Sequence, residues 1–137
     1  ACAYAAEVAA AFQLENYEGV YIEPMEDGTL GYNNGDGSIH LSDVLISPYA
    51  SPLEIMNTIT HELRHQYQSE AILGLHDEVP ESVRNEWAVA QQIYNYDSPS
   101  CYDPWGYTYN PLEIDARFAG ESVVRNVTNG IINDLVA

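Results

Sequence analysis

The clearest pattern of apolar and polar positions lies in the middle of the chain. Apolar side chains recur there at helical spacing, at Leu53, Met56, Ile59, Leu63 and Tyr67. Ser51 and Pro52 suit the N-cap and the first position of a helix, and Glu54 would complete a capping box. Neither Gly nor Pro interrupts residues 55–70. The pattern therefore predicts a well-defined helix over residues 51–71.

The other segments predict a single α+β domain over residues 1–137. Short runs of β-branched and aromatic residues predict strands at residues 20–23, 29–32 and 38–41. Apolar periodicity predicts further helices at residues 3–15, 80–96 and 111–128, with a loop between the last two and a short helical tail as a candidate after residue 128. The polar residues 33–37 indicate a hairpin, and residues 44–46 are a candidate extension of the sheet. We expect a small, mostly antiparallel sheet packed on the 51–71 helix.

The charge balance excludes some classes of partner. Twenty-one acidic residues face four basic ones, all Arg, which gives a net charge of −17. Nucleic acids and anionic membrane surfaces both require a positive footprint, so we expect neither as a partner. No apolar run is long enough to cross a bilayer. We expect a monomer that is secreted by a bacterium, for which the charge provides solubility, and a peptide or protein substrate, with basic ones favoured electrostatically.

The candidate chemistry lies within the predicted central helix. His61-Glu62-Leu63-Arg64-His65 is an H-E-x-x-H pattern, and residues four apart lie on the same face of a helix. His61 and His65 can therefore offer two imidazole nitrogens to one metal ion, with Glu62 close enough to reach a water bound to it. The alternative is a solvated helix face, because three fixed positions also occur by chance. The position of the pattern in the middle of a well-defined helix favours a metal site.

A hydrolytic zinc site usually has a third protein ligand. A third histidine in the extended H-E-x-x-H-x-x-G-x-x-H pattern is excluded, since the chain has Gln68 and Ala71 at the required positions. The later segment N-P-L-E-I-D-A-R-F-A, residues 110–119, offers Glu113 and Asp115 near the start of a predicted helix. Each has an alternative role within that helix, Glu113 as a capping residue and Asp115 as a partner of the helix dipole.

Together, H-E-L-R-H-Q-Y-Q and N-P-L-E-I-D-A-R-F-A resemble the small bacterial and phage-type zincin metallopeptidases of the gluzincin-like kind. The resemblance implies a zincin-like fold in which His61, His65 and Glu113 bind zinc and Glu62 is the general base. Many gluzincins place Asp or Asn four residues after the ligand Glu, where this chain has Arg117. Asp115 therefore stays the alternative third ligand.

These features predict a zinc-dependent peptidase that hydrolyses peptide bonds through a metal-activated water, with Zn²⁺ as its cofactor. Glu62 would take the proton of that water and pass it to the leaving amine. Tyr107 and Tyr109 lie closest in sequence to Glu113 and are candidates to stabilise the oxyanion, as is His76; the alternative for each is a packing role. The strand at residues 38–41 is a candidate for aligning an extended substrate by edge pairing.

Two other functions remain open from the sequence. One is a catalytically inactive zincin-fold binding module. The other is a calcium-dependent surface module, because Asn34, Asp36, Gly37 and Asp43 match positions 3, 5, 6 and 12 of an EF-hand loop. Tyr32 replaces the usual first ligand, which favours a polar hairpin turn instead.

The cysteines, Cys2 and Cys101, could form one disulfide in an oxidising compartment or remain two free thiols.

Overall fold

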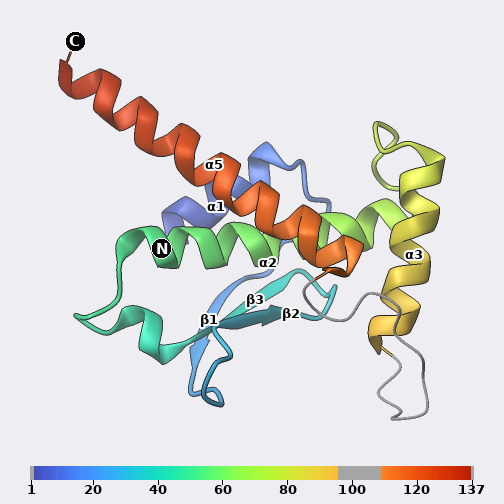
Figure 1. Cartoon of the computed structure of the whole chain (residues 1–137), viewed down its shortest axis with the longest axis horizontal. Coiled ribbons are helices and arrows are strands. Elements are labelled where there is room, and N and C mark those ends of the chain that lie inside the picture. Colours follow the sequence, from blue (N-terminus) through green and yellow to red (C-terminus); the bar gives the residue numbers. More distant parts are fainter. Residues whose placement is uncertain (1, 96–108, 137) are drawn as a thin grey trace.

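The computed structural model of the protein describes residues 2–95 and 109–136. In chain order its elements are α1 (Cys2–Ala11), β1 (Gly19–Glu23), β2 (Gly31–Asn33), β3 (Ser38–Ser42), the 3₁₀-helix η1 (Asp43–Ile46), α2 (Pro52–Ile72), α3 (Glu81–Asn95) and α5 (Pro111–Val136). Figure 1 shows α2 running through the middle of the molecule, with the sheet on one side and α5 crossing it on another. The fold is α+β, as the sequence predicts.

The sheet is mixed, because β3 lies between β1 and β2. β3 pairs with β2 in the predicted antiparallel hairpin and with β1 in parallel. The expectation of a mostly antiparallel sheet is therefore wrong for one of its two pairs. Since β3 has a partner on both sides, residues 38–41 cannot align a substrate by edge pairing, and that prediction is also wrong. The edge strand that contacts α2 is β2.

The two faces of the sheet differ in character because side chains alternate along each strand. Ile39 and Leu41 of β3 are buried in a cluster with α1 and α2. His40 lies between them on the opposite face, stacked against Tyr21 and Tyr32 of the neighbouring strands. His40 therefore belongs to the outer face of the sheet, away from the interior that α2 shares.

Helix α2 takes part in both hydrophobic clusters of the described residues. Its start is capped by Ser51, whose hydroxyl accepts a hydrogen bond from the backbone N–H of Leu53 at 3.2 Å. Ile59 and Leu63 join the cluster with α1 and β3, and Tyr67 and Ala71 join a second one with α3 and the first turn of α5. α2 thus fixes the positions of the sheet, α3 and α5 together.

Small residues allow α5 to lie close against α2. Ala116 is fully buried, and a Cβ atom on Gly120 would collide with the side chain of Asn57 on α2. This close crossing brings the first turn of α5 beside the middle of α2, although the two segments are about fifty residues apart in sequence.

Three predicted boundaries differ from the structure for local reasons. Residues 44–46 belong to η1 rather than the sheet, because the Ser42 hydroxyl accepts a hydrogen bond from the Val44 N–H and starts a turn. Helix α1 ends at Ala11, and Gln13 follows with a φ of 54° that no helix continues through. Helix α5 continues without a break to Val136, so the predicted end at residue 128 is wrong and the candidate helical tail belongs to the same helix.

Cys2 is exposed at the start of α1, while Cys101 lies outside the described residues. Within residues 2–95 and 109–136, no helix combines the length and the apolar character that crossing a bilayer requires.

Candidate metal centre

Two histidines of α2 face each other one turn apart, as the H-E-x-x-H pattern predicts. The Nε2 atoms of His61 and His65 are 3.2 Å apart. Their rings meet edge to face, with an interplanar angle of 82° and centroids 4.8 Å apart. The two nitrogens therefore point into the same small space beside the helix.

Glu113 of α5 completes the group. Asn110 caps the helix, since its Oδ1 accepts a hydrogen bond from the Leu112 N–H at 2.9 Å, and Glu113 follows in the first turn. Glu113 Oε2 lies 3.0 Å from His61 Nε2, and Oε1 lies 3.2 Å from His65 Nε2. Both oxygens thus face the histidines, so the carboxylate serves the group rather than the cap of its own helix.

The spacing of these atoms fits a tetrahedral metal ion. Zinc lies roughly 2.0–2.2 Å from histidine nitrogens and carboxylate oxygens, which places adjacent ligand atoms about 3.3 Å apart in a tetrahedron. The contacts of His61 and His65 with each other and with Glu113 measure 3.0–3.2 Å, with a different oxygen of Glu113 facing each histidine, and one ligand atom from each residue lies within 4.8 Å of the others. Two imidazoles and one carboxylate suit Zn²⁺ and its first-row neighbours, whereas Ca²⁺ and Mg²⁺ prefer oxygen ligands. The group can therefore hold a metal ion.

The electrostatics of the group also favour a cation at this place. Burial opposes the ionised form of Glu113, but hydrogen bonds from His61 and His65 outweigh it and hold the pKa of the carboxyl well below its usual range. Burial likewise opposes the charged form of His65, yet Glu113 and Glu62 raise its pKa to about 9. A positive charge is thus stabilised between the imidazoles and the carboxylate, where a metal can replace the proton.

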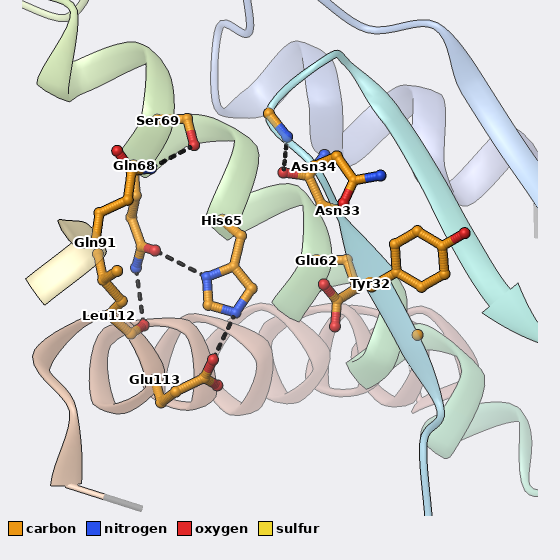
Figure 2. A pocket seen from close by; sticks show the side chains of 12 residues that line it. Tyr32, Asn33, Asn34, Glu62, His65, Gln68, Ser69, Gln91, Leu112 and Glu113 are labelled. Carbon is orange, nitrogen blue, oxygen red and sulfur yellow. Dashed lines mark hydrogen bonds and ion pairs between the residues drawn. The ribbon is translucent and has the colours of Figure 1, made fainter. Parts of the chain in front are cut away.

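Glu62 lies beside this group in the same pocket (Figure 2). It is only 7% exposed, and this burial raises the pKa of its carboxyl despite the opposing influence of His65 and His61. A carboxylate with a raised pKa is suited to accept a proton and return it near neutral pH.

Edge strand β2 approaches Glu62 closely because it carries a glycine. A Cβ atom on Gly31 would lie 2.9 Å from the backbone oxygen of His40 and 3.3 Å from the Glu62 Cγ. No larger side chain fits there unless the strand or Glu62 moves. Gly31 was not predicted as a site residue from the sequence, although a glycine within a predicted strand is a known sign of close approach.

Gln68, one turn after His65, fixes the orientation of that imidazole. Its Nε2 donates to the Leu112 carbonyl at 2.9 Å and to Asp115 Oδ2 at 2.8 Å. Its Oε1 is therefore the atom that faces His65 Nδ1, at 2.9 Å. Since an amide oxygen only accepts, Nδ1 carries a proton and Nε2 is the nitrogen left for a metal. Figure 2 shows this chain from Leu112 through Gln68 and His65 to Glu113.

The alternative ligand, Asp115, is engaged elsewhere. Arg64 donates to both of its oxygens, from Nε at 2.8 Å and from Nη2 at 3.2 Å. The guanidinium of Arg64 also lies 4.4 Å from the centre of the Tyr67 ring. The structure thus brings Glu113, and not Asp115, to the two histidines. Asp115 supports His65 indirectly, through Gln68.

The supporting roles of Arg64 and Gln68 were not predicted from the sequence. Gln68 lies three residues after His65, a spacing at which side chains meet on a helix. That spacing was the available signal for its contact with the imidazole.

A pocket of about 340 Å³ opens beside the group. It is lined by Glu62, His65 and Glu113, by β2 and the turn after it, and by Gln68, Ser69, Gln91 and Leu112. Tyr32 also borders it, but its hydroxyl donates to Glu23 at 2.8 Å on the outer face of the sheet.

Of the residues considered as oxyanion stabilisers, the two that the structure describes, Tyr109 and His76, are not brought to this pocket. Tyr107 lies outside the described residues. Tyr109 is 71% exposed and lines a separate groove with Ile114 and Phe118. His76 is buried near the far end of α2, where its Nε2 lies 3.0 Å from Glu70.

The turn considered as a calcium loop binds its own side chains. Asp36 Oδ1 accepts hydrogen bonds from the backbone N–H and the hydroxyl of Ser38, and Asn33 Oδ1 accepts one from the Gly35 N–H. Among the described residues, His61, His65 and Glu113 form the only group of three potential ligands close enough to share an ion. The turn has the geometry of a polar hairpin.

No protein-family model matches the chain, and no curated protein and no solved structure matches it either. The function must therefore be inferred from the geometry of the site.

Proposed function

We propose that this protein is a zinc-dependent peptidase with a zincin-like arrangement, in which His61, His65 and Glu113 bind zinc and Glu62 is the general base. The observation that carries the proposal is the convergence of the three ligand atoms within 4.8 Å of one another beside a buried carboxylate. A pocket of about 340 Å³ gives a substrate access to this place. The resemblance of residues 61–68 and 110–119 to gluzincin-like peptidases supports the same assignment.

The residues of the chain have separate tasks in this proposal. Zinc, when bound, supplies a Lewis acid for the scissile carbonyl and lowers the pKa of water. Glu62 accepts a proton and returns it to the leaving amine, and its burial raises the pKa of its carboxyl, which strengthens it as a proton acceptor. Gln68 holds His65 in the orientation in which Nε2 faces the metal position.

Strand β2 is the element best placed to align an extended substrate. It lies at the edge of the sheet and borders the pocket through Gly31, Tyr32 and Asn33. Its outer backbone groups can pair with an added strand, which is a common mode of peptide recognition. The net charge of −17 adds a long-range attraction for cations and basic substrates and disfavours nucleic acids.

The test combines metal analysis with digestion. We expect the chelator-treated protein to take up one equivalent of zinc and then to cleave an unfolded protein substrate. Glu62→Gln should keep the zinc and lose the cleavage, because only the proton acceptor is removed. Glu121→Gln, which changes an exposed carboxylate of α5, is the matched control and should cleave like the wild type. Zinc uptake without any cleavage by the wild type would favour the inactive binding module, and full activity of Glu62→Gln would refute the base assignment.

A further inference from the structure

The pocket beside the candidate metal centre has a wall of neutral polar side chains that the proposed reaction does not use. This polar wall consists of Asn34 in the turn after β2, Ser69 on α2 and Gln91 on α3. Figure 2 shows Ser69 and Gln91 on one side of His65 and Asn34 on the other. We propose that the polar wall is a specificity subsite that selects a substrate side chain with neutral hydrogen-bonding groups, a carboxamide such as that of Asn or Gln above all.

The three elements that supply the polar wall meet at Ser69. A Cβ atom on Gly35, next to Asn34, would lie 3.4 Å from Ser69 Oγ. From the other direction, Gln91 Nε2 donates to the same oxygen at 3.3 Å. The wall is therefore continuous across parts of the chain that are distant in sequence.

The turn that carries Asn34 is held in place by hydrogen bonds to Gln66 of α2. Gln66 Oε1 accepts hydrogen bonds from the Gly37 N–H at 2.9 Å and from Asn33 Nδ2 at 3.0 Å. Gln66 itself is 1% exposed. Because this support is buried and fully bonded, the backbone of the turn that presents the exposed side chain of Asn34 is held in place before a ligand arrives, which lowers the entropy cost of binding.

Several hydrogen-bonding groups of the wall are uncommitted within the described part of the chain. No hydrogen bond there engages the side chain of Asn34 or the Oε1 atom of Gln91, and the hydroxyl of Ser69 serves only as an acceptor. Other amides of the pocket are different, because Asn33 and Gln68 are fully engaged with protein partners. The wall thus offers free donors and free acceptors together.

This combination decides which side chain fits. A carboxamide presents both a donor and an acceptor and can satisfy the wall, whereas Leu or Met would cover the same groups and leave them without partners. The net charge of −17 repels Asp and Glu. It attracts Lys and Arg at long range, but these side chains find no carboxylate in the wall itself, because Glu62 and Glu113 of the same pocket are assigned to the proposed reaction and metal. A pocket of about 340 Å³ is large enough for one such side chain.

The inference rests on the proposed function for its biological meaning, but it can be tested with and without turnover. In the first experiment, the zinc-loaded protein digests a peptide mixture with all residues equally represented on both sides of the scissile bond, and mass spectrometry locates the cuts. At one position, Asn or Gln should be preferred at least tenfold over Leu or Met. Asn34→Leu and Gln91→Leu should each reduce that ratio toward one, while Gln92→Leu, an exposed neighbour on α3, should leave it unchanged.

The second experiment needs no catalysis. N-acetyl-glutaminamide and N-acetyl-leucinamide are titrated into the isotope-labelled protein, and the NMR signals of Asn34, Ser69 and Gln91 are followed. The glutaminamide should shift these signals at a concentration several-fold lower than the leucinamide does. Equal shifts with both ligands, or no shifts, would overturn the subsite whether or not the protein digests peptides. Digestion without a carboxamide preference would overturn it too, while zinc uptake without digestion would reject the proposed function alone.

Discussion

Gln68 Oε1 lies 2.9 Å from His65 Nδ1, and this contact ties the candidate metal centre to the packing of α2 against α5. The same Gln68 amide donates to the Leu112 carbonyl and to Asp115 on α5. The buried side chain of Gln68 therefore makes the orientation of the His65 imidazole on α2 depend on where α5 lies.

Removing the Gln68 amide should weaken metal binding. In Gln68→Leu, His65 Nδ1 loses its acceptor and the ring can turn, so zinc affinity should fall by roughly 10–100-fold. Competition with a chromophoric chelator measures the change. Gln92→Leu, an amide of α3 exposed to solvent, is the control for substitution of the same type. Wild-type affinity in Gln68→Leu would show that the hydrogen bond does not position the imidazole.

Glu113 and Asp115 can be distinguished by isosteric substitutions. Glu113→Gln removes a charge that contacts both histidines, so zinc affinity should drop by more than about 100-fold, beyond the effect of an outer-shell partner. Asp115→Asn should cost about tenfold or less, because Asp115 acts through Gln68 and Arg64. Isothermal titration of both variants gives the comparison. The reverse order of affinities would make Asp115 the ligand.

The sequence alone predicted those parts of the candidate metal centre that depend on the spacing of residues within one helix. Ser51 and Pro52 indicated the start of α2, and the spacing of His61 and His65 alone placed both on one face. The role of Glu113 required a resemblance in addition, because its contact with His61 depends on how α5 crosses α2. Gly120 and Ala116 permit that crossing, but small residues in a sequence do not indicate which helix will pack against them.

Neither the strand order nor the wall of the pocket could be predicted from such local patterns. A hairpin signal fixed the pairing of β2 with β3, yet nothing in residues 19–23 indicated that β1 would add to the other side of β3 in parallel. The short apolar run of η1 could not be separated from a strand by its periodicity. The sequence favoured a polar hairpin over a calcium loop at residues 33–37, but it did not indicate that the buried amide of Gln66 holds this turn.

Gly31 should be required for activity more than for metal binding. Gly31→Ala places a methyl group 2.9 Å from the His40 carbonyl oxygen, 3.2 Å from the Thr58 Cγ2 and 3.3 Å from the Glu62 Cγ, so β2 or these side chains of α2 must move. We expect at least a tenfold loss of kcat/KM with zinc content unchanged, because a misplaced base costs rate rather than ligands. Gly130→Ala, where an added Cβ would meet nothing within 4 Å, is the control. Unchanged cleavage in Gly31→Ala would contradict this role.

Glu70 should make the stability of the fold sensitive to acid. It accepts hydrogen bonds from the backbone N–H groups of Glu15 and Asn16 and from Gln66 Nε2, and it faces His76. Burial opposes its ionised form, but these contacts outweigh burial and lower its pKa. A carboxyl with a lowered folded pKa stabilises the protein above its unfolded pKa of about 4.3, and this contribution is lost as the pH falls through the folded value.

Glu70→Gln should therefore lower the free energy of unfolding at pH 7 by about 1–3 kcal/mol and flatten the loss of stability below pH 5. Urea denaturation at several pH values measures both effects. Glu121→Gln, which changes an exposed carboxylate of α5, should alter neither. An equal pH dependence in Glu70→Gln and the wild type would show that the acid sensitivity arises elsewhere.

The central claim is that His61, His65 and Glu113 bind one zinc ion beside Glu62. Diffraction from crystals of the zinc-loaded protein, recorded on either side of the zinc absorption edge, tests it most directly. We expect one strong anomalous peak about 2.0–2.2 Å from Nε2 of both histidines and from a carboxylate oxygen of Glu113. A peak at any other place, or imidazoles that share no ion, would contradict it.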